Sequence, residues 1–107
     1  MNTNFITVAI NCTIRRDKID AARQELEEVI KIVMREEPAC HGIWVHVDPL
    51  DLQRMLIIEH WDNEDIFKGP HMQTPHMQAF LAKAGDFLDG EAEFTFWKPI
   101  FIASPAT

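Results

Sequence analysis

The chain has 107 residues, 47% of them hydrophobic and 25% charged, which is the size and composition of one folded domain. A formal net charge of −7, with no cationic cluster beyond Arg15-Arg16, argues against binding to nucleic acid or to anionic membranes. The sequence also has no Tyr, no cationic start of a signal peptide, and no run of about 18 apolar residues that could span a membrane.

The two cysteines, Cys12 and Cys40, lie far apart in the sequence and form no CxxC motif. The simplest interpretation is a pair of reduced thiols in the core of a cytoplasmic protein. We therefore expect a cytoplasmic protein whose fold does not depend on disulfides.

The first predicted element is a strand over residues 4–14, where the side chains alternate with a period of two. One face is apolar and consists of Ile6, Val8, Ile10, Cys12 and Ile14. The other face is mixed and consists of Phe5, Thr7, Ala9, Asn11 and Thr13. A long amphipathic helix follows, because apolar side chains recur at helical spacing over residues 19–34. Asp17 is its predicted N-cap, with Asp20 three residues later, and Pro38 ends it.

Two further strands are predicted over residues 42–48 and 54–61, joined by a polar turn. Asp62 is the predicted cap of a short helix over residues 63–68, and Gly69-Pro70 breaks this helix.

The last helix is predicted to start at Thr74, an N-cap that is followed by Pro75 in the first helical position. Gly90 is expected to end it. A final strand is predicted over residues 91–100, and Pro99 restricts that strand to an edge or an end of the sheet.

The order β-α-β-β-α-α-β predicts one α+β domain over residues 1–107, a ferredoxin-like split-βαβ fold with an antiparallel sheet. Helices of this chain can cover only one face of that sheet, yet the strands carry large apolar side chains on both faces. Those expected opposite the helices are Phe5, Trp44, Met55, Ile57 and Trp61. We therefore expect a second copy to cover the free face, giving a homodimer with its sheets packed face to face.

Three segments resemble a known family: residues 36–42 (Glu-Glu-Pro-Ala-Cys-His-Gly), 58–61 (Ile-Glu-His-Trp) and 71–80 (His-Met-Gln-Thr-Pro-His-Met-Gln-Ala-Phe). Their order and spacing are similar to those of the antibiotic biosynthesis monooxygenase superfamily, and within it to the quinol monooxygenase-like members. The resemblance implies a dimeric α+β barrel of ferredoxin-like protomers. It also implies oxygenation of electron-rich phenols, anthrones or quinols by O₂ with no metal or flavin, whereas relatives degrade haem or isomerise a phosphorylated sugar.

Such a reaction needs an apolar pocket, a base that deprotonates the substrate, and donors that hold the resulting oxyanion. His76 is the first candidate base, because the positive end of the helix dipole near the start of the last helix disfavours imidazolium. His46 on the second strand is another candidate base, and His71 is expected at the same pocket. The alternative for His76 is a hydrogen bond to a local backbone group.

Five other residues are candidate substrate contacts. Asn11 could donate to a substrate oxygen, as a first-strand Asn does in some relatives, or pair with the backbone. Trp61 could stack on a planar ring or belong to a dimer core, and the same two interpretations apply to Trp44. Glu59 is either a salt-bridged strand residue or a pocket acid with a raised pKa. Phe80, on the apolar side of the last helix, is an expected pocket residue.

No metal site is predicted. The pairs His41/His46 and His71/His76 are each five residues apart, which matches neither a helical nor a zinc-finger spacing. We expect no cofactor, and haem ligation by His76 is the alternative that the haem-degrading relatives leave open.

Together these residues predict a small cofactor-independent monooxygenase that oxidises a quinol or polyphenol-type aromatic with O₂. One alternative is an isomerase of a small phosphorylated or hydroxy-ketone metabolite, for which Lys or Arg would be wanted in the pocket. The other is a non-catalytic ligand-binding dimer on the same fold.

Overall fold

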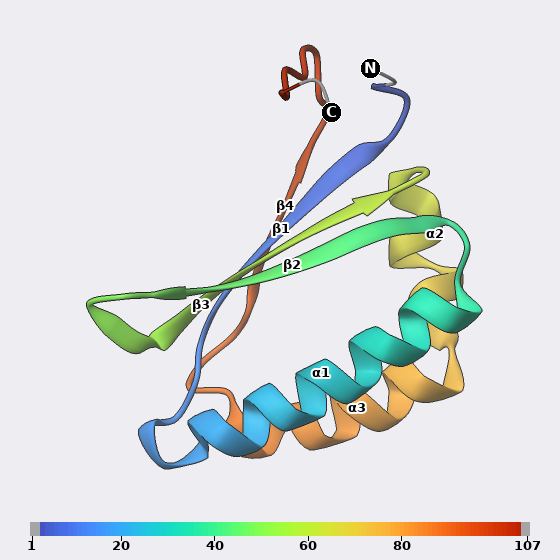
Figure 1. Cartoon of the computed structure of the whole chain (residues 1–107). Coiled ribbons are helices and arrows are strands. Elements are labelled where there is room, and N and C mark those ends of the chain that lie inside the picture. Colours follow the sequence, from blue (N-terminus) through green and yellow to red (C-terminus); the bar gives the residue numbers. More distant parts are fainter. Residues whose placement is uncertain (1–2, 106–107) are drawn as a thin grey trace.

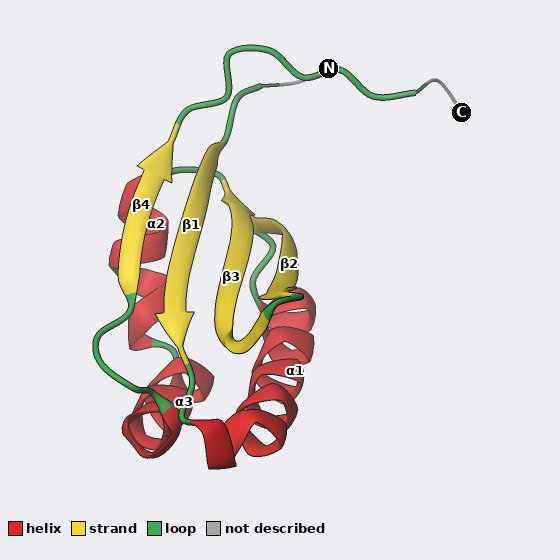
Figure 2. Ribbon diagram, turned by 90° about the vertical axis from the view of Figure 1, so that its left-hand side faces the viewer, coloured by secondary structure: helices red, strands yellow, loops and turns green. Residues whose placement is uncertain are grey.

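A single antiparallel sheet contains four strands: β1 (Ile6–Thr13), β2 (Cys40–Asp48), β3 (Asp51–Trp61) and β4 (Glu93–Trp97). Their order across the sheet is β2-β3-β1-β4, so β1 lies between β3 and β4 (Figure 2). The computed structural model describes residues 3–105.

Helices α1 (Ile19–Glu36) and α3 (Pro75–Phe87) pack against each other on one face of the sheet (Figure 1). The short helix α2 (Glu64–Lys68) follows β3, and 3₁₀ turns over Arg16–Lys18 and Pro70–Gln73 precede α1 and α3. The predicted α+β, ferredoxin-like arrangement is confirmed. No helix in residues 3–105 is long and apolar enough to cross a membrane.

The predicted orientation of β3 is wrong for three residues, which face the helices and are buried: Met55, Ile57 and Trp61. Directly paired residues of antiparallel strands share a face, and Ile57 pairs with Ile10 of the helix-covered face. Alternation alone could not place β3, because Leu56 and Ile58 on its other face are apolar too. The pairing with β1 therefore decides which side chains reach the core.

The start of α3 is confirmed, since Thr74 Oγ1 accepts the backbone N–H of Met77 at 3.2 Å. The predicted cap of α1 is wrong, because Asp17 lies inside the 3₁₀ turn and α1 begins after it without a side-chain cap. The cap of α2 is Asn63 rather than Asp62; Asn63 Oδ1 accepts the N–H of Ile66 at 2.9 Å. Side-chain hydrogen bonds thus mark the starts of α2 and α3, whereas α1 begins without one.

Several predicted bounds were too wide or too narrow. Helix α3 ends at Phe87 instead of continuing to Gly90, since Leu88 pairs with Ile14 in an isolated bridge. Strand β4 covers only part of the predicted residues 91–100, and β3 begins earlier than predicted. Both cysteines are free, as expected.

The second face of the sheet has no element over it in the described part of the chain (Figure 1). Phe5 and Trp44, predicted on this face, lie there on either side of His60, with ring centroids 4.5 and 4.7 Å from the imidazole. We call it the open face; its central residues are Ala9, Ile58 and Trp44, with Thr95 on β4.

Ile14 follows β1, pairs with Leu88 at the end of α3, and packs in the core between the sheet and the helices. Its side chain is only 2% exposed. Ile14→Ala should lower the free energy of unfolding by about 2–5 kcal/mol, because it removes buried surface and leaves a cavity. Leu50→Ala, at a turn residue that is 96% exposed, is the control and should change it by less than about 0.5 kcal/mol. Urea unfolding followed by fluorescence measures both; equal effects would contradict this account of the core.

Candidate active site

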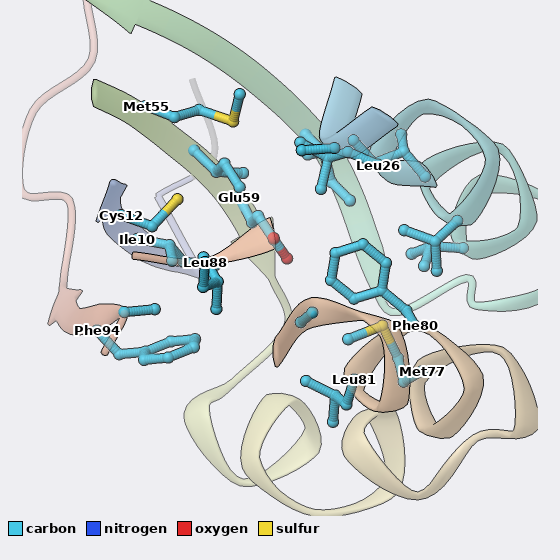
Figure 3. Close-up of a pocket in the computed structure, with 18 of the residues that line it drawn as sticks. Ile10, Cys12, Leu26, Met55, Glu59, Met77, Phe80, Leu81, Leu88 and Phe94 are labelled. Carbon is cyan, nitrogen blue, oxygen red and sulfur yellow. The ribbon is translucent and has the colours of Figure 1, made fainter. Parts of the chain in front are cut away.

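A cavity of about 120 Å³ lies between the helix-covered face of the sheet and helices α1 and α3. Its walls are almost entirely apolar and include Ile10, Leu26, Ile43, Ile57, Phe80 and Phe94. Glu59 and His71 supply the only carboxyl and imidazole groups of the lining, and no Lys or Arg among the described residues reaches it. Figure 3 shows the Glu59 carboxyl pointing into this space, with the rings of Phe80 and Phe94 on two sides.

Glu59 is held in the cavity wall by β3, opposite Val8 of β1. Trp61, two residues later and therefore on the same face, donates its Nε1–H to Glu59 Oε1 at 2.8 Å. Burial raises the pKa of the Glu59 carboxyl to about 7, and the Trp61 hydrogen bond opposes this rise. Near neutral pH Glu59 can therefore either hold or release a proton.

A cluster of three titratable side chains lies beside the cavity, and its members come from segments far apart in the sequence. Glu37, which directly follows α1, lies 2.9 Å from His71 Nδ1 through Oε1 and 2.7 Å from His76 Nε2 through Oε2. His71 belongs to the 3₁₀ turn before α3, and His76 to the first turn of α3. Burial lowers the pKa of His71, while the hydrogen bond to Glu37 acts in the opposite direction. Neutral imidazole is thus favoured at the cavity wall.

Two aromatic rings contact the imidazole of His71. Its imidazole lies 4.3 Å from the Trp61 ring and 5.3 Å from the Phe67 ring, measured between centroids. Trp61 itself is fully buried and does not line the cavity. Trp61 therefore contacts Glu59 and His71, and it offers no surface on which a ligand in the cavity could stack directly.

The sheet separates the predicted site residues into two groups. Those on the helix side are Glu59, Trp61, His71, His76 and Phe80, and those on the open face are Asn11, Trp44 and His46. Asn11 and His46 line a separate groove with Arg54 and Glu93, and His46 Nδ1 lies 3.2 Å from the Leu56 carbonyl. Neither side chain contacts the cavity beside Glu59. His76 does not line that cavity either; it is connected to the cavity wall through Glu37 and His71.

Glu37 is the residue that sequence reasoning missed, although it lies in one of the segments that carry the family resemblance. Its residue type does not distinguish it from Glu36, which is exposed and pairs with Arg35. Only the fold brings Glu37 to two histidines more than thirty residues away. Its position directly before Pro38, at the end of a long helix, was the one available signal.

A family model described as antibiotic biosynthesis monooxygenase matches residues 5–83, which include Glu37, Glu59, His71 and His76. The chain belongs to the antibiotic biosynthesis monooxygenase family. Membership of this family supports a monooxygenase-type function. No curated protein matches the chain.

Solved structures of proteins described as candidate antibiotic biosynthesis monooxygenases have the same fold. A candidate member from Bacteroides thetaiotaomicron is 19% identical, with a TM-score of 0.84 and 97% of each chain covered. One from Nitrosomonas europaea is 12% identical, with a TM-score of 0.84, covering 97% of this chain and 98% of that chain. A third, from Caulobacter crescentus, is 16% identical, with a TM-score of 0.84 and 92% of each chain covered. At these identities the likeness concerns the fold alone.

Metal ligands are not grouped in this family member: residues 3–105 contain no cluster of three or more His, Cys, Asp or Glu side chains that could hold a metal ion. The Glu37 carboxylate is instead engaged by His71 and His76 at hydrogen-bond distance. Cys40 lies nearby, and burial raises its thiol pKa to about 12, so it stays protonated.

Glu59→Gln tests the buried carboxyl, because it keeps an acceptor for Trp61 but removes the ionisation. The wild-type pKa of about 7 lies above the ordinary 4.5, so the folded state binds more protons than the unfolded state between these values. Wild-type stability should therefore fall relative to the variant as pH rises through this window, by on the order of 3 kcal/mol in total.

Urea unfolding at several pH values between 4.5 and 8 measures this difference. Glu28→Gln, at an exposed position of α1, is the matched control for replacing a carboxyl group by an amide. A flat difference curve for Glu59→Gln would contradict the raised pKa.

Proposed function

We propose that this chain is a monooxygenase that acts with O₂ on an electron-rich phenol or quinol with a single ring, without an added cofactor. The observation that carries the proposal is the apolar cavity, where Glu59 and His71 are the groups suited to proton transfer among the described residues that line it. A cavity of about 120 Å³ is similar in scale to dry protein cavities of about 150 Å³ that bind benzene.

The proposed chemistry needs no external reductant. A hydroquinone loses four electrons when one oxygen atom enters the ring and the ring is oxidised to the hydroxyquinone. O₂ accepts these four electrons; its second oxygen leaves as water with two hydrogens from the quinol. The first requirement is removal of the phenolic proton, since the anion gives up an electron to O₂ far more readily than the neutral phenol.

His71 replaces His76 as the proposed base, because His71 lines the cavity and His76 does not. Its lowered pKa keeps the imidazole unprotonated and ready to accept a proton near pH 7. Glu59 is the proposed donor to the substrate oxygen, since its raised pKa keeps a fraction protonated at the same pH. Phe80 is the proposed ring contact.

The isomerase alternative is less well supported. A phosphorylated substrate would bring a charge of about −2 into an apolar cavity, and no Lys or Arg of the described residues lines it. A neutral aromatic ring carries no such cost.

Oxygen consumption with a panel of single-ring hydroquinones and phenols tests the activity directly. We expect uptake of one O₂ per quinol, and a loss of about 10²–10⁴-fold in kcat for His71→Asn, which removes the base. His41→Asn is the matched control, because His41 is exposed and pairs with Asp62 away from the cavity. Folded wild-type protein that consumes no oxygen with any substrate, yet binds the rings, would indicate a binding protein instead.

We further propose that two copies associate through the open face. This face carries Trp44 at 47% exposure together with Phe5, Ala9 and Ile58, which form a largely apolar surface without a covering element among the described residues. A second open face is the surface of matching size and polarity that the same chain offers. His60, between Phe5 and Trp44, would lie inside the interface.

Light scattering tests this association and should give twice the chain mass of 12.4 kDa. Trp44→Asp places a charge on the open face and should shift the equilibrium to monomer. Met34→Asp is the control, since Met34 is 45% exposed on α1, away from the open face. A wild-type monomer at high concentration would refute the homodimer.

A further inference from the structure

One carboxylate joins two imidazoles at the edge of the cavity, and the reaction proposed above gives it no task. Glu37 lies 2.9 and 3.0 Å from His71 Nδ1, one distance for each carboxylate oxygen, and 2.7 Å from His76 Nε2. The Glu37, His71 and His76 side chains are 12%, 3% and 11% exposed. Such a closed cluster restrains all three side chains.

The contacts decide which nitrogen of each ring carries a proton. An ionised carboxylate can only accept hydrogen bonds, so His71 donates from Nδ1 and His76 donates from Nε2. A neutral His71 then has its single proton on Nδ1, and Nε2 carries the free lone pair.

Nε2 of His71 borders open space. Within residues 3–105 both hydrogen bonds of this ring are made by Nδ1, and no fully buried side-chain nitrogen or oxygen lacks a partner. Nε2 therefore cannot be sealed inside the protein. The open space that His71 lines is the apolar cavity beside Glu59.

We propose that Glu37 is a positioning residue, which holds His71 as the Nδ1–H tautomer and so presents the lone pair of Nε2 to the cavity. The inference rests on the proposed function, because it states how the base of that reaction is prepared. His76, by donating to Oε2, fixes the orientation of the carboxylate. When Nε2 accepts a proton, the carboxylate beside Nδ1 stabilises the imidazolium.

The surroundings of His71 contain few competing charges. Glu37 faces it from the end of α1, His76 from α3, and Glu59 shares the cavity from β3. Trp61 and Phe67 contact the ring without adding a charge. Glu37 is thus the carboxylate in direct contact with His71, and removing it should change the tautomer of that ring.

Long-range ¹H–¹⁵N correlation spectra of the uniformly labelled chain report the tautomer of each histidine. Above the ordinary histidine pKa of about 6.5, wild-type His71 should show a proton on Nδ1 and none on Nε2. Glu37→Met removes the acceptor with little change in length, so His71 should show a mixture of both tautomers. Glu36→Met, at the exposed neighbour, is the control and should leave the His71 signals unchanged.

A wild-type His71 with its proton on Nε2 would overturn the inference, as would a Glu37→Met spectrum with an unaltered tautomer. The wild-type spectrum alone decides the first point, even where Glu37→Met does not fold. These spectra need no substrate, so they stand apart from the oxygen-uptake test. Where uptake is observed, Glu37→Met should lower kcat at least tenfold with a smaller change in KM, and Glu36→Met should not.

Discussion

The antiparallel pairing of β1 with β3 is the constraint on which the rest of the structure depends. It sets Val8 opposite Glu59 and Ile10 opposite Ile57, so the apolar face of β1 continues directly into β3. A slip of one residue would turn Glu59 to the open face and bring Ile58 into the core. The same pairing therefore defines the core, the polar group in the cavity wall, and the composition of the open face.

Burying carboxyl and imidazole groups beneath two helices opposes folding, and the structure compensates each of them. Glu59 accepts from Trp61, and Glu37 accepts from two histidines, so no buried side-chain nitrogen or oxygen in the described residues lacks a partner. Burial raises the pKa of Glu59 and lowers that of His71, so both groups can exchange protons near neutral pH. The groups that cost stability are thus the ones suited to proton transfer.

Much of the fold was predictable from the sequence, and much less of the site was. Long periodic segments such as α1 and the strong Thr74-Pro75 signal identified the elements correctly. The orientation of β3 was not predictable, because apolar residues occupy both of its faces and only pairing with β1 distinguishes them. Asn11 and His46 were grouped with His76 for the same reason: residue type does not reveal which side of a sheet a side chain occupies.

The proposed proton transfers avoid an unpaired charge in the apolar cavity, and Glu37, Glu59 and His71 each have a part in this. A phenol that loses its proton places an anion among apolar walls, which is costly unless a cation forms beside it. In the proposed reaction the proton moves only as far as His71, whose imidazolium is paired with Glu37. A protonated Glu59 then donates to the oxyanion without adding a second negative charge. The phenolic proton is thus held at the cavity wall until it leaves in the product water, so the deprotonation does not require exchange with bulk water.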